Sequence, residues 1–165
     1  MNILALDLGT HAGFCHTIEA GGTVSGTWDL ATAKEITAWG KLRLTRRRDP
    51  RVRRFQEKLQ VVSPAPDLVV FEDVQFTSYT FQTQLWSALR AAAWLAFSDR
   101  TVFECVPVTT LKKFATGSGG ADKGGMKKFL MLRYPEFRGY EMDDNEIDAI
   151  WIYKWAKENL SRMAV

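Results

Sequence analysis

The stretch NILALDLGTHAGFCHTIEAGGTVSGTWDL (residues 2–30) carries three strand-like runs separated by glycine-containing turns. The first run is apolar enough to be a buried strand, and a tight turn from Gly9 to Gly13 leads into the second run. Gly21-Gly22 marks a hairpin before the third run. The chain is therefore expected to open with three antiparallel strands. They are predicted at residues 2–8, 13–19 and 23–30.

The rest of the chain alternates between helical and strand-like patterns. Residues 31–62 are helical in pattern but interrupted near Asp49-Pro50, where Pro50 is suited to begin a new helix. The run DLVVFEDV (residues 67–74) has the short apolar core of a central strand. The remaining predicted elements are a long helix at Phe81–Phe97, a strand at Thr101–Val108, and helices at residues 109–115, 122–133 and 145–160.

This order of elements predicts an α/β fold in which helices flank a mixed five-stranded sheet with three antiparallel N-terminal strands. A length of 165 residues fits a single domain over residues 1–165. If the fourth strand pairs beside the first, Asp7 and Glu72 lie on neighbouring strands. The last helix must then bring its own acidic residues to the same end of the sheet.

The composition is that of an ordinary globular protein, with 46% hydrophobic and 25% charged residues. No run approaches the roughly 20 apolar residues of a membrane helix, so no membrane partner is expected. The N-terminus lacks the basic region and cleavage site of a signal peptide, which predicts a cytoplasmic protein. Cys15 and Cys105 have no metal-ligand spacing and are interpreted as reduced core residues.

Positive charge is concentrated between Lys41 and Lys58. This segment holds nine basic and two acidic residues, a local charge of +7 that leaves −4 for the rest of a chain whose net charge is +3. Such an asymmetry favours a polyanionic partner, although a solvated helix face is the alternative. Arginine dominates, and its planar group suits phosphate contacts. The predicted DNA-binding residues in this segment are Arg46, Arg47, Arg48, Arg51, Arg53 and Arg54.

Four acidic residues in three separate apolar settings are the candidate catalytic and metal-binding residues: Asp7, Glu72, Asp144 and Asp148. A carboxylate is expensive to desolvate in such places unless a partner or a metal compensates its charge. Oxygen ligands are what Mg²⁺ or Mn²⁺ prefer. Any one of these residues alone is equally compatible with a strand-end acid that faces water.

The acidic residues near the last predicted helix need separate interpretations. Asp144 and Asp148 are four residues apart and share one helix face, so together they can hold a cation. Asp143 and Glu146 are rotated off that face and are interpreted as helix-start charges. Asp143 or Asp144 can also serve as the N-cap of the helix.

Four carboxylates around two divalent cations suit one reaction, the in-line attack of water on a phosphodiester. No Ser/His/Asp or Cys/His set competes with them. The two histidines, His11 and His16, both lie in the first hairpin, and His11 is interpreted as a loop residue.

Several motifs together resemble the RuvC-type Holliday junction resolvases of the RNase H-like superfamily, over nearly the whole chain. They are Asp7 followed by Gly9-Thr10, Glu72 on the fourth strand, the block LKKFATGSGGADKGGM (residues 111–126), and an acidic pair before Asp148-Ala-Ile. The block, with Thr116, Gly117, Gly119, Ala121 and Lys123, is the most specific of these motifs. The resemblance implies lysines that touch the DNA backbone near the cleaved bond, with Lys112, Lys113, Lys123 and Lys127 as candidates.

Two positions depart from the family pattern. The family places its penultimate ligand three residues before the last aspartate, where this chain has Asn145, so Asp144 is chosen as fourth ligand with Asn145 as the alternative. The family also stacks an aromatic residue at the junction centre, and Phe76 and Tyr79 are the candidates at a shifted spacing.

The resemblance implies a Mg²⁺-dependent endonuclease, with Mn²⁺ as a substitute and two ions per site, which cuts branched DNA by paired symmetric hydrolysis. It implies a homodimer formed through the Phe81–Phe97 helix and no nucleotide cofactor. The alternatives are an RNase H-like nuclease of other specificity and a non-catalytic nucleic-acid-binding module. An actin-like ATPase is favoured only by the Asp-Leu-Gly-Thr motif, and the chain is short for that fold.

Overall fold

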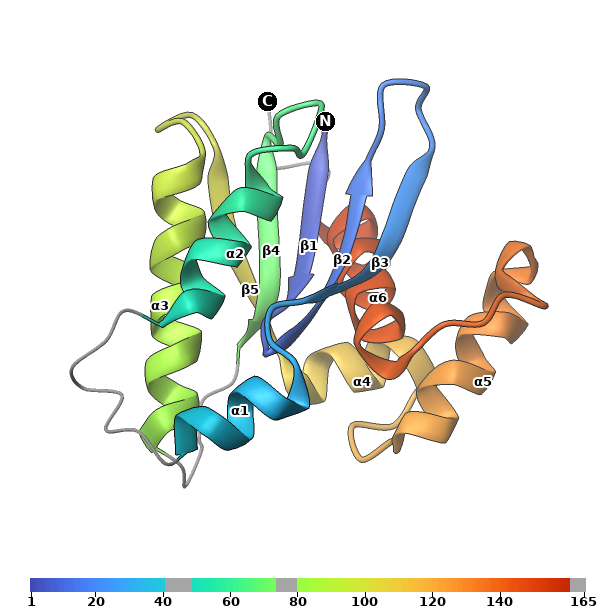
Figure 1. The fold of residues 1–165 in the computed structure, drawn as a ribbon. Helices are drawn as coiled ribbons and strands as arrows, with labels where there is room; N and C mark the ends of the chain where they lie inside the picture. The colour runs from blue at the N-terminus through green and yellow to red at the C-terminus, as the bar shows by residue number, and fades with distance from the viewer. Residues whose placement is uncertain (41–48, 74–79, 161–165) are drawn as a thin grey trace.

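Five strands form one mixed sheet in the order β3-β2-β1-β4-β5 (Figure 1). The strands β1, β2 and β3 are antiparallel neighbours, whereas β4 runs parallel to β1 and β5 runs parallel to β4. Their bounds are β1 Ile3–Asp7, β2 His11–Thr17, β3 Thr23–Asp29, β4 Leu68–Asp73 and β5 Val102–Pro107. The computed structural model describes residues 1–40, 49–73 and 80–160. The predicted fold class and the pairing of the fourth strand beside the first are confirmed.

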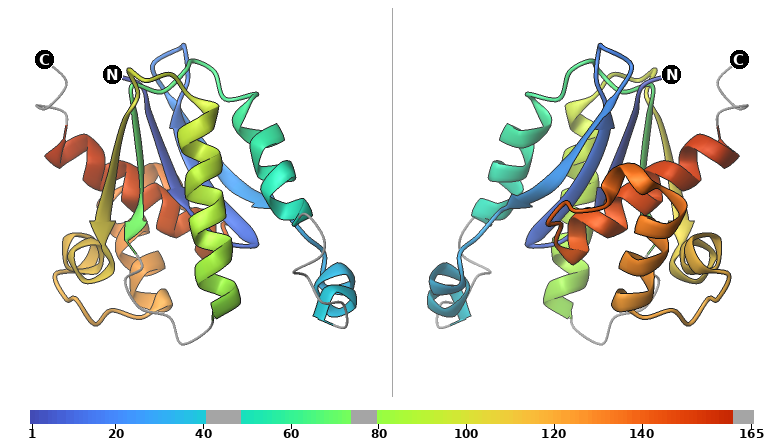
Figure 2. Two further views of the ribbon diagram at one scale, coloured as in Figure 1. Left: turned by 90° about the vertical axis from the view of Figure 1, so that its left-hand side faces the viewer. Right: turned by 90° about the vertical axis from the view of Figure 1, so that its right-hand side faces the viewer.

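Helices cover both faces of this sheet (Figure 2). Helices α2 and α3 pack on one face and α6 packs on the other, while α4 and α5 lie beside α6. The bounds are α1 Ala33–Gly40, α2 Pro50–Leu59, α3 Thr80–Ala96, α4 Val108–Thr116, α5 Lys123–Arg133 and α6 Asp144–Asn159, with a short 3-10 turn at Pro135–Phe137.

The alternation of side chains along β1 explains why its sequence is apolar throughout. Ile3 and Ala5 join the core beneath α6, and Leu4 and Leu6 join the core beneath α2 and α3. Because a central strand is buried on both faces, it needs hydrophobic residues at successive positions. The first polar side chain of β1 is Asp7, where the strand ends.

The strands β1, β4 and β5 end at the same edge of the sheet, and α1 and α4 lie near that edge (Figure 1). Helix α2 begins at Pro50 behind the N-cap Asp49, as the interruption of the 31–62 pattern predicts. Residues 41–48 of that pattern lie outside the described residues.

The interpretation of both cysteines as core residues needs correction. Cys15 is buried but Cys105 is exposed, so only the first is a core thiol. Within the described residues, no helix combines the length and the apolarity needed to cross a membrane.

Candidate active site

Three of the four predicted carboxylates come together at the end of β1 and β4. Asp7 is the last residue of β1, Glu72 is the penultimate residue of β4, and Asp148 lies in the second turn of α6. The parallel register pairs Leu6 with Phe71, which sets Asp7 beside Glu72 on strands that lie about 5 Å apart. Asp7, Glu72 and Asp148 are called the acidic site below.

Gly13 explains how α6 reaches this position. It pairs with Asp7 across β1 and β2, and a Cβ atom at Gly13 would overlap the backbone carbonyl of Asn145 in the first turn of α6. A glycine within a strand often marks such a close approach of another backbone. The helix can therefore lie directly against the sheet, which brings Asp148 toward Asp7.

Hydrogen bonds from β3 fix the first turn of α6. The Asp143 carboxylate caps the helix by accepting from the backbone N–H of Glu146 at 2.8 Å, and it also accepts from the Thr27 hydroxyl at 2.7 Å. The Glu146 carboxylate accepts from the Ser25 hydroxyl at 2.7 Å. Of the two alternatives for the N-cap, Asp143 is the one observed.

Burial raises the pKa of all three carboxyl groups in the acidic site, and repulsion from a nearby carboxylate adds to this rise in each case. Burial, followed by the charges of Asp148 and Glu72, raises the pKa of Asp7 to about 8. Burial and the charge of Asp148 raise the pKa of Glu72 to about 7. Burial also raises the pKa of Asp148 to about 6, although nearby lysines oppose this change. The site thus concentrates negative charge that the protein neutralises only in part.

Asp144 has a different environment from the acidic site. Its carboxylate lies 2.9 Å from the Lys123 ammonium group, and about half of its side chain is exposed. It is still close enough to raise the pKa of Asp148. The backbone carbonyl of Asn145 faces Gly13, and this contact involves no side-chain atom of Asn145. The choice between Asp144 and Asn145 as fourth ligand stays a prediction.

The donor chemistry of the acidic site fits a hard divalent cation, since its oxygen atoms repel one another and a cation would relieve that repulsion. Among residues 1–40, 49–73 and 80–160, however, no three His, Cys, Asp or Glu side chains are already grouped so that they could hold one ion. Binding would therefore require side-chain adjustment. The metal-binding roles of Asp7, Glu72, Asp144 and Asp148 stay predictions.

Lysines from α4 and α5 surround the acidic site. Lys112 acts to lower the pKa of Glu72 and Asp148, and Lys123 acts to lower the pKa of Asp7 and Asp148. Lys113 is exposed near the end of α4, and Lys127 is half-buried on α5. The motif at residues 111–126 therefore places positive charge beside the carboxylates. Its contact with DNA stays a prediction.

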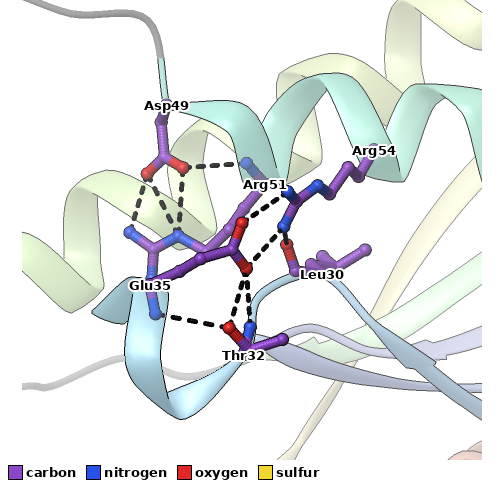
Figure 3. A network of polar contacts seen from close by, with 6 residues as sticks. All are labelled: Leu30, Thr32, Glu35, Asp49, Arg51 and Arg54. Atoms are coloured by element: carbon purple, nitrogen blue, oxygen red, sulfur yellow. Dashed lines mark hydrogen bonds and ion pairs between the residues drawn. The ribbon is translucent and has the colours of Figure 1, made fainter. Parts of the chain in front are cut away.

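Arg51 and Arg54, two of the predicted DNA contacts, are engaged within the protein (Figure 3), and DNA binding by either residue stays a prediction. Arg51 donates to both carboxylate oxygens of Asp49 and, through Nη1, to the Thr10 hydroxyl at 3.0 Å. Arg54 donates to the carboxylate of Glu35 at 2.7 Å and to the Leu30 carbonyl at 2.8 Å. The two ion pairs, Glu35–Arg54 and Asp49–Arg51, are called the arginine network below.

Arg53 differs from its neighbour Arg54. Its side chain is 84% exposed and makes an ion pair with Glu57 one turn later, a weak contact that a phosphate can replace. DNA binding by Arg53 stays a prediction. The other predicted DNA contacts in these segments, Arg46, Arg47, Arg48, Phe76 and Tyr79, lie outside the described residues.

Two residues near the acidic site were missed by the sequence interpretation. Gly13 was treated only as the end of a turn, although a glycine inside a strand pattern could have signalled the contact with α6. Arg90 on α3 donates to the backbone carbonyl of Glu72 and to the Asp73 carboxylate, both at 3.4 Å. Nothing in the helical pattern of residues 81–97 distinguishes Arg90 from a surface arginine.

Solved structures with the same arrangement of elements identify the fold. The Thermus thermophilus RuvC structure matches with a TM-score of 0.65 and 16% identity, over 96% of this chain and 96% of that one. T. thermophilus RuvC in complex with Holliday junction substrate matches with a TM-score of 0.72 and 16% identity, over 99% of this chain and 97% of that one. This chain has the RuvC fold. No family model and no curated protein matches it.

Proposed function

We propose that this protein is a metal-dependent, structure-selective endonuclease that resolves four-way and other branched DNA junctions by paired cuts. The observation that carries the proposal is the meeting of Asp7, Glu72 and Asp148, from β1, β4 and α6, in a RuvC fold. A similar solved structure was determined in complex with Holliday junction substrate, which supports the choice of substrate.

Each group around the site has a proposed part in the reaction. Asp7, Glu72 and Asp148, with Asp144 as fourth ligand, would hold Mg²⁺ or Mn²⁺. Bound divalent cations supply an activated water and stabilisation of the leaving oxygen. Lys112 and Lys123 hold the DNA backbone near the carboxylates by contacts to phosphate oxygens.

Paired cuts require two sites, and α3 offers a surface on which two copies can join. Leu85 and Leu89 on α3 are buried against the sheet. Large apolar side chains face outward at other positions of α3. They are Phe81 at 68% exposure, Trp94 at 54% and Leu95 at 81%. Trp94 and Leu95 are neighbours at the C-terminal end of α3, where a second copy could cover them, and a two-fold dimer would place two identical sites.

Cleavage of a synthetic four-way junction tests the nuclease. We expect paired nicks with Mg²⁺ and none with EDTA, while junction binding persists in both conditions. Asp99→Asn is the matched control for the same substitution in the acidic site. Asp99 is an exposed carboxylate in the turn before β5, at the opposite end of the sheet. Binding without cleavage under all metal conditions would instead indicate a non-catalytic DNA-binding module.

Sedimentation tests the dimer. Leu95→Glu should give monomers that nick junctions without paired cleavage, because the two sites are no longer held together. Leu132→Glu on α5 is the control, since Leu132 is also exposed, at 62%, and lies on another helix. A native protein that sediments as a monomer and still makes coordinated paired cuts would contradict a dimer.

A further inference from the structure

His11 and Asp29 are hydrogen-bonded at the same end of the sheet as the acidic site. The two residues are directly opposite in the β2–β3 register, and Nδ1 of His11 lies 2.6 Å from a carboxylate oxygen of Asp29. The His11 side chain is 50% exposed. Because Nδ1 faces the carboxylate, Nε2 remains the nitrogen that is open to a ligand.

The strand register locates His11 relative to the acidic site. Asp7 pairs with Gly13, and His11 lies two residues from Gly13 along β2. Side chains two residues apart point to the same face of a sheet and are separated by about 7 Å. That face is the one covered by α6, since Thr27, opposite Gly13, donates to Asp143. The imidazole therefore lies on the face of the acidic site, just beyond the end of β1.

The backbone that carries His11 is also held in place. The carbonyl of Thr10 accepts from the backbone N–H of Leu30 at 2.9 Å, and the Thr10 hydroxyl accepts from Arg51 at 3.0 Å. The imidazole is thus restricted by its contact with Asp29, whose side chain is 76% exposed, and by the held backbone of the residue before it. A side chain that is already restricted loses less entropy when it binds a ligand.

We propose that His11, oriented by Asp29, contacts a backbone phosphate of the DNA beside the acidic site. This inference rests on the proposed function. A protonated imidazole donates from both nitrogens, Nδ1 to Asp29 and Nε2 to a phosphate oxygen. The neighbouring groups on β3 and α6 that face this edge include the carboxylates of Asp143 and Glu146, which repel a phosphate. His11 supplies the donor that lets the DNA backbone approach on the β2–β3 side, whereas Lys112 and Lys123 act from α4 and α5.

Junction binding in EDTA at several salt concentrations tests the contact without cleavage. His11→Gln should weaken binding about five- to tenfold, the effect of one lost hydrogen bond at an exposed position. It should also reduce the salt slope by about one unit. His16→Gln is the matched control, because His16 lies on the same strand but faces the opposite side, near Phe14. That variant should bind like the unaltered protein.

The role of Asp29 is tested by a double-mutant cycle. The loss caused by His11→Gln should be smaller in an Asp29→Asn background, because the imidazole is then no longer oriented. An equal loss in both backgrounds would overturn the orienting role of Asp29.

Nuclear magnetic resonance of the unaltered protein gives a measurement that does not depend on a variant's folding. The chain has two histidines, so the two imidazole signals are readily assigned. Addition of junction DNA should shift the signals of His11 and leave those of His16 in place. Unchanged His11 signals with bound DNA, or normal junction binding by His11→Gln, would overturn this inference alone. Failure of the unaltered protein to bind a junction would overturn the proposed function as well.

Discussion

At the end of β1 and β4, three carboxylates lie within range of one another, whereas at the start of α2 two carboxylates each face an arginine. In the acidic site, burial and like charges raise the pKa of Asp7 to about 8. In the arginine network, hydrogen bonds from Arg54 lower the pKa of Glu35 to about 2. Burial acts to raise the pKa of Asp49, but hydrogen bonds from Arg51 outweigh it and lower the pKa. In the first region, Lys112 and Lys123 compensate the carboxylates only in part, whereas in the second region each carboxylate is paired with an arginine.

This difference separates the charged residues that are candidates for function from those that stabilise the fold. Like charges that lie close together lower the stability of the fold, and they are kept where a ligand requires them. A cluster of mutually repelling charges therefore marks a candidate site. Paired charges at the start of a helix stabilise the local structure and have little left to offer a ligand. The predictions below test this distinction, from the largest expected effect to the smallest.

The largest effect is expected when one carboxylate of the acidic site becomes neutral. Asp7→Asn or Asp148→Asn should lower the cleavage rate about a thousandfold or more, because the cations contribute several kcal/mol to the reaction. Junction binding should persist, since phosphate contacts remain. Gel assays of cleavage and binding on the same junction measure both effects. Cleavage near the native rate in both variants would remove the acidic site from the reaction.

The next effect is a fall in stability of the metal-free protein as the pH rises. Asp7 has a folded-state pKa of about 8 against an ordinary value of 3.8, so between these values the native state binds more protons than the unfolded state. The free energy of unfolding therefore decreases as the pH rises from about 4 to 8, by an amount on the order of 5 kcal/mol. The raised pKa values of Glu72 and Asp148 change the stability in the same direction.

Thermal unfolding in EDTA at pH 5 and pH 8 measures this change. Asp7→Asn should flatten the dependence on pH and raise the stability at pH 8, and Mg²⁺ should raise the melting temperature of the native protein there. A native melting temperature that rises from pH 5 to pH 8 in EDTA would contradict the electrostatic description of the site.

Asp144 shares features of both regions. It is next to the acidic site, but its carboxylate is paired with Lys123. If it is the fourth ligand, Asp144→Asn should lower cleavage about 10- to 100-fold, as loss of a supporting ligand interaction does. Its stability should change little, because Asp143 caps the helix. Cleavage at increasing Mn²⁺ concentration measures the loss. A native metal dependence in this variant would leave Asn145 or no residue as the fourth ligand.

Much of the fold was predictable because strand and turn patterns are local. Residues 2–30 contain their own hairpin signals, and the apolar run before Glu72 predicts a central strand beside the first. The acidic site was predictable because a carboxylate next to such a run is costly. For these residues, the adjacent sequence is enough to make the prediction.

The unpredicted features depend on contacts between distant segments. Arg51 and Arg54 were indistinguishable from Arg53 by sequence, and only the positions of Thr10 and Glu35 show which arginines are engaged. The outward side of α3 likewise depends on its rotation against the sheet, which a helix that is apolar on several sides does not specify.

Asp49 tests the stabilising role of the arginine network. Asp49→Ala removes the N-cap of α2 and one side of the ion pair with Arg51, and should lower the free energy of unfolding by about 1 to 2 kcal/mol. Asp49→Asn should cost less, because Asn caps a helix about as well as Asp. Urea unfolding measures both variants. An equal loss in the two variants would assign the stabilisation to the ion pair instead of the cap.

The smallest effect is expected from the neighbouring pair Arg53 and Arg54. Arg53→Gln should reduce the salt slope of junction binding by about one unit and leave the melting temperature unchanged, because its side chain is exposed. Arg54→Gln should lower the melting temperature, because it breaks the contacts with Glu35 and Leu30. It should leave the salt slope unchanged, because it removes no phosphate contact. The two variants carry the same change in charge, so long-range electrostatics affect them alike. A salt slope reduced equally in both would show that Arg54 leaves its partners to bind DNA, and the distinction between the two regions would then fail at this residue.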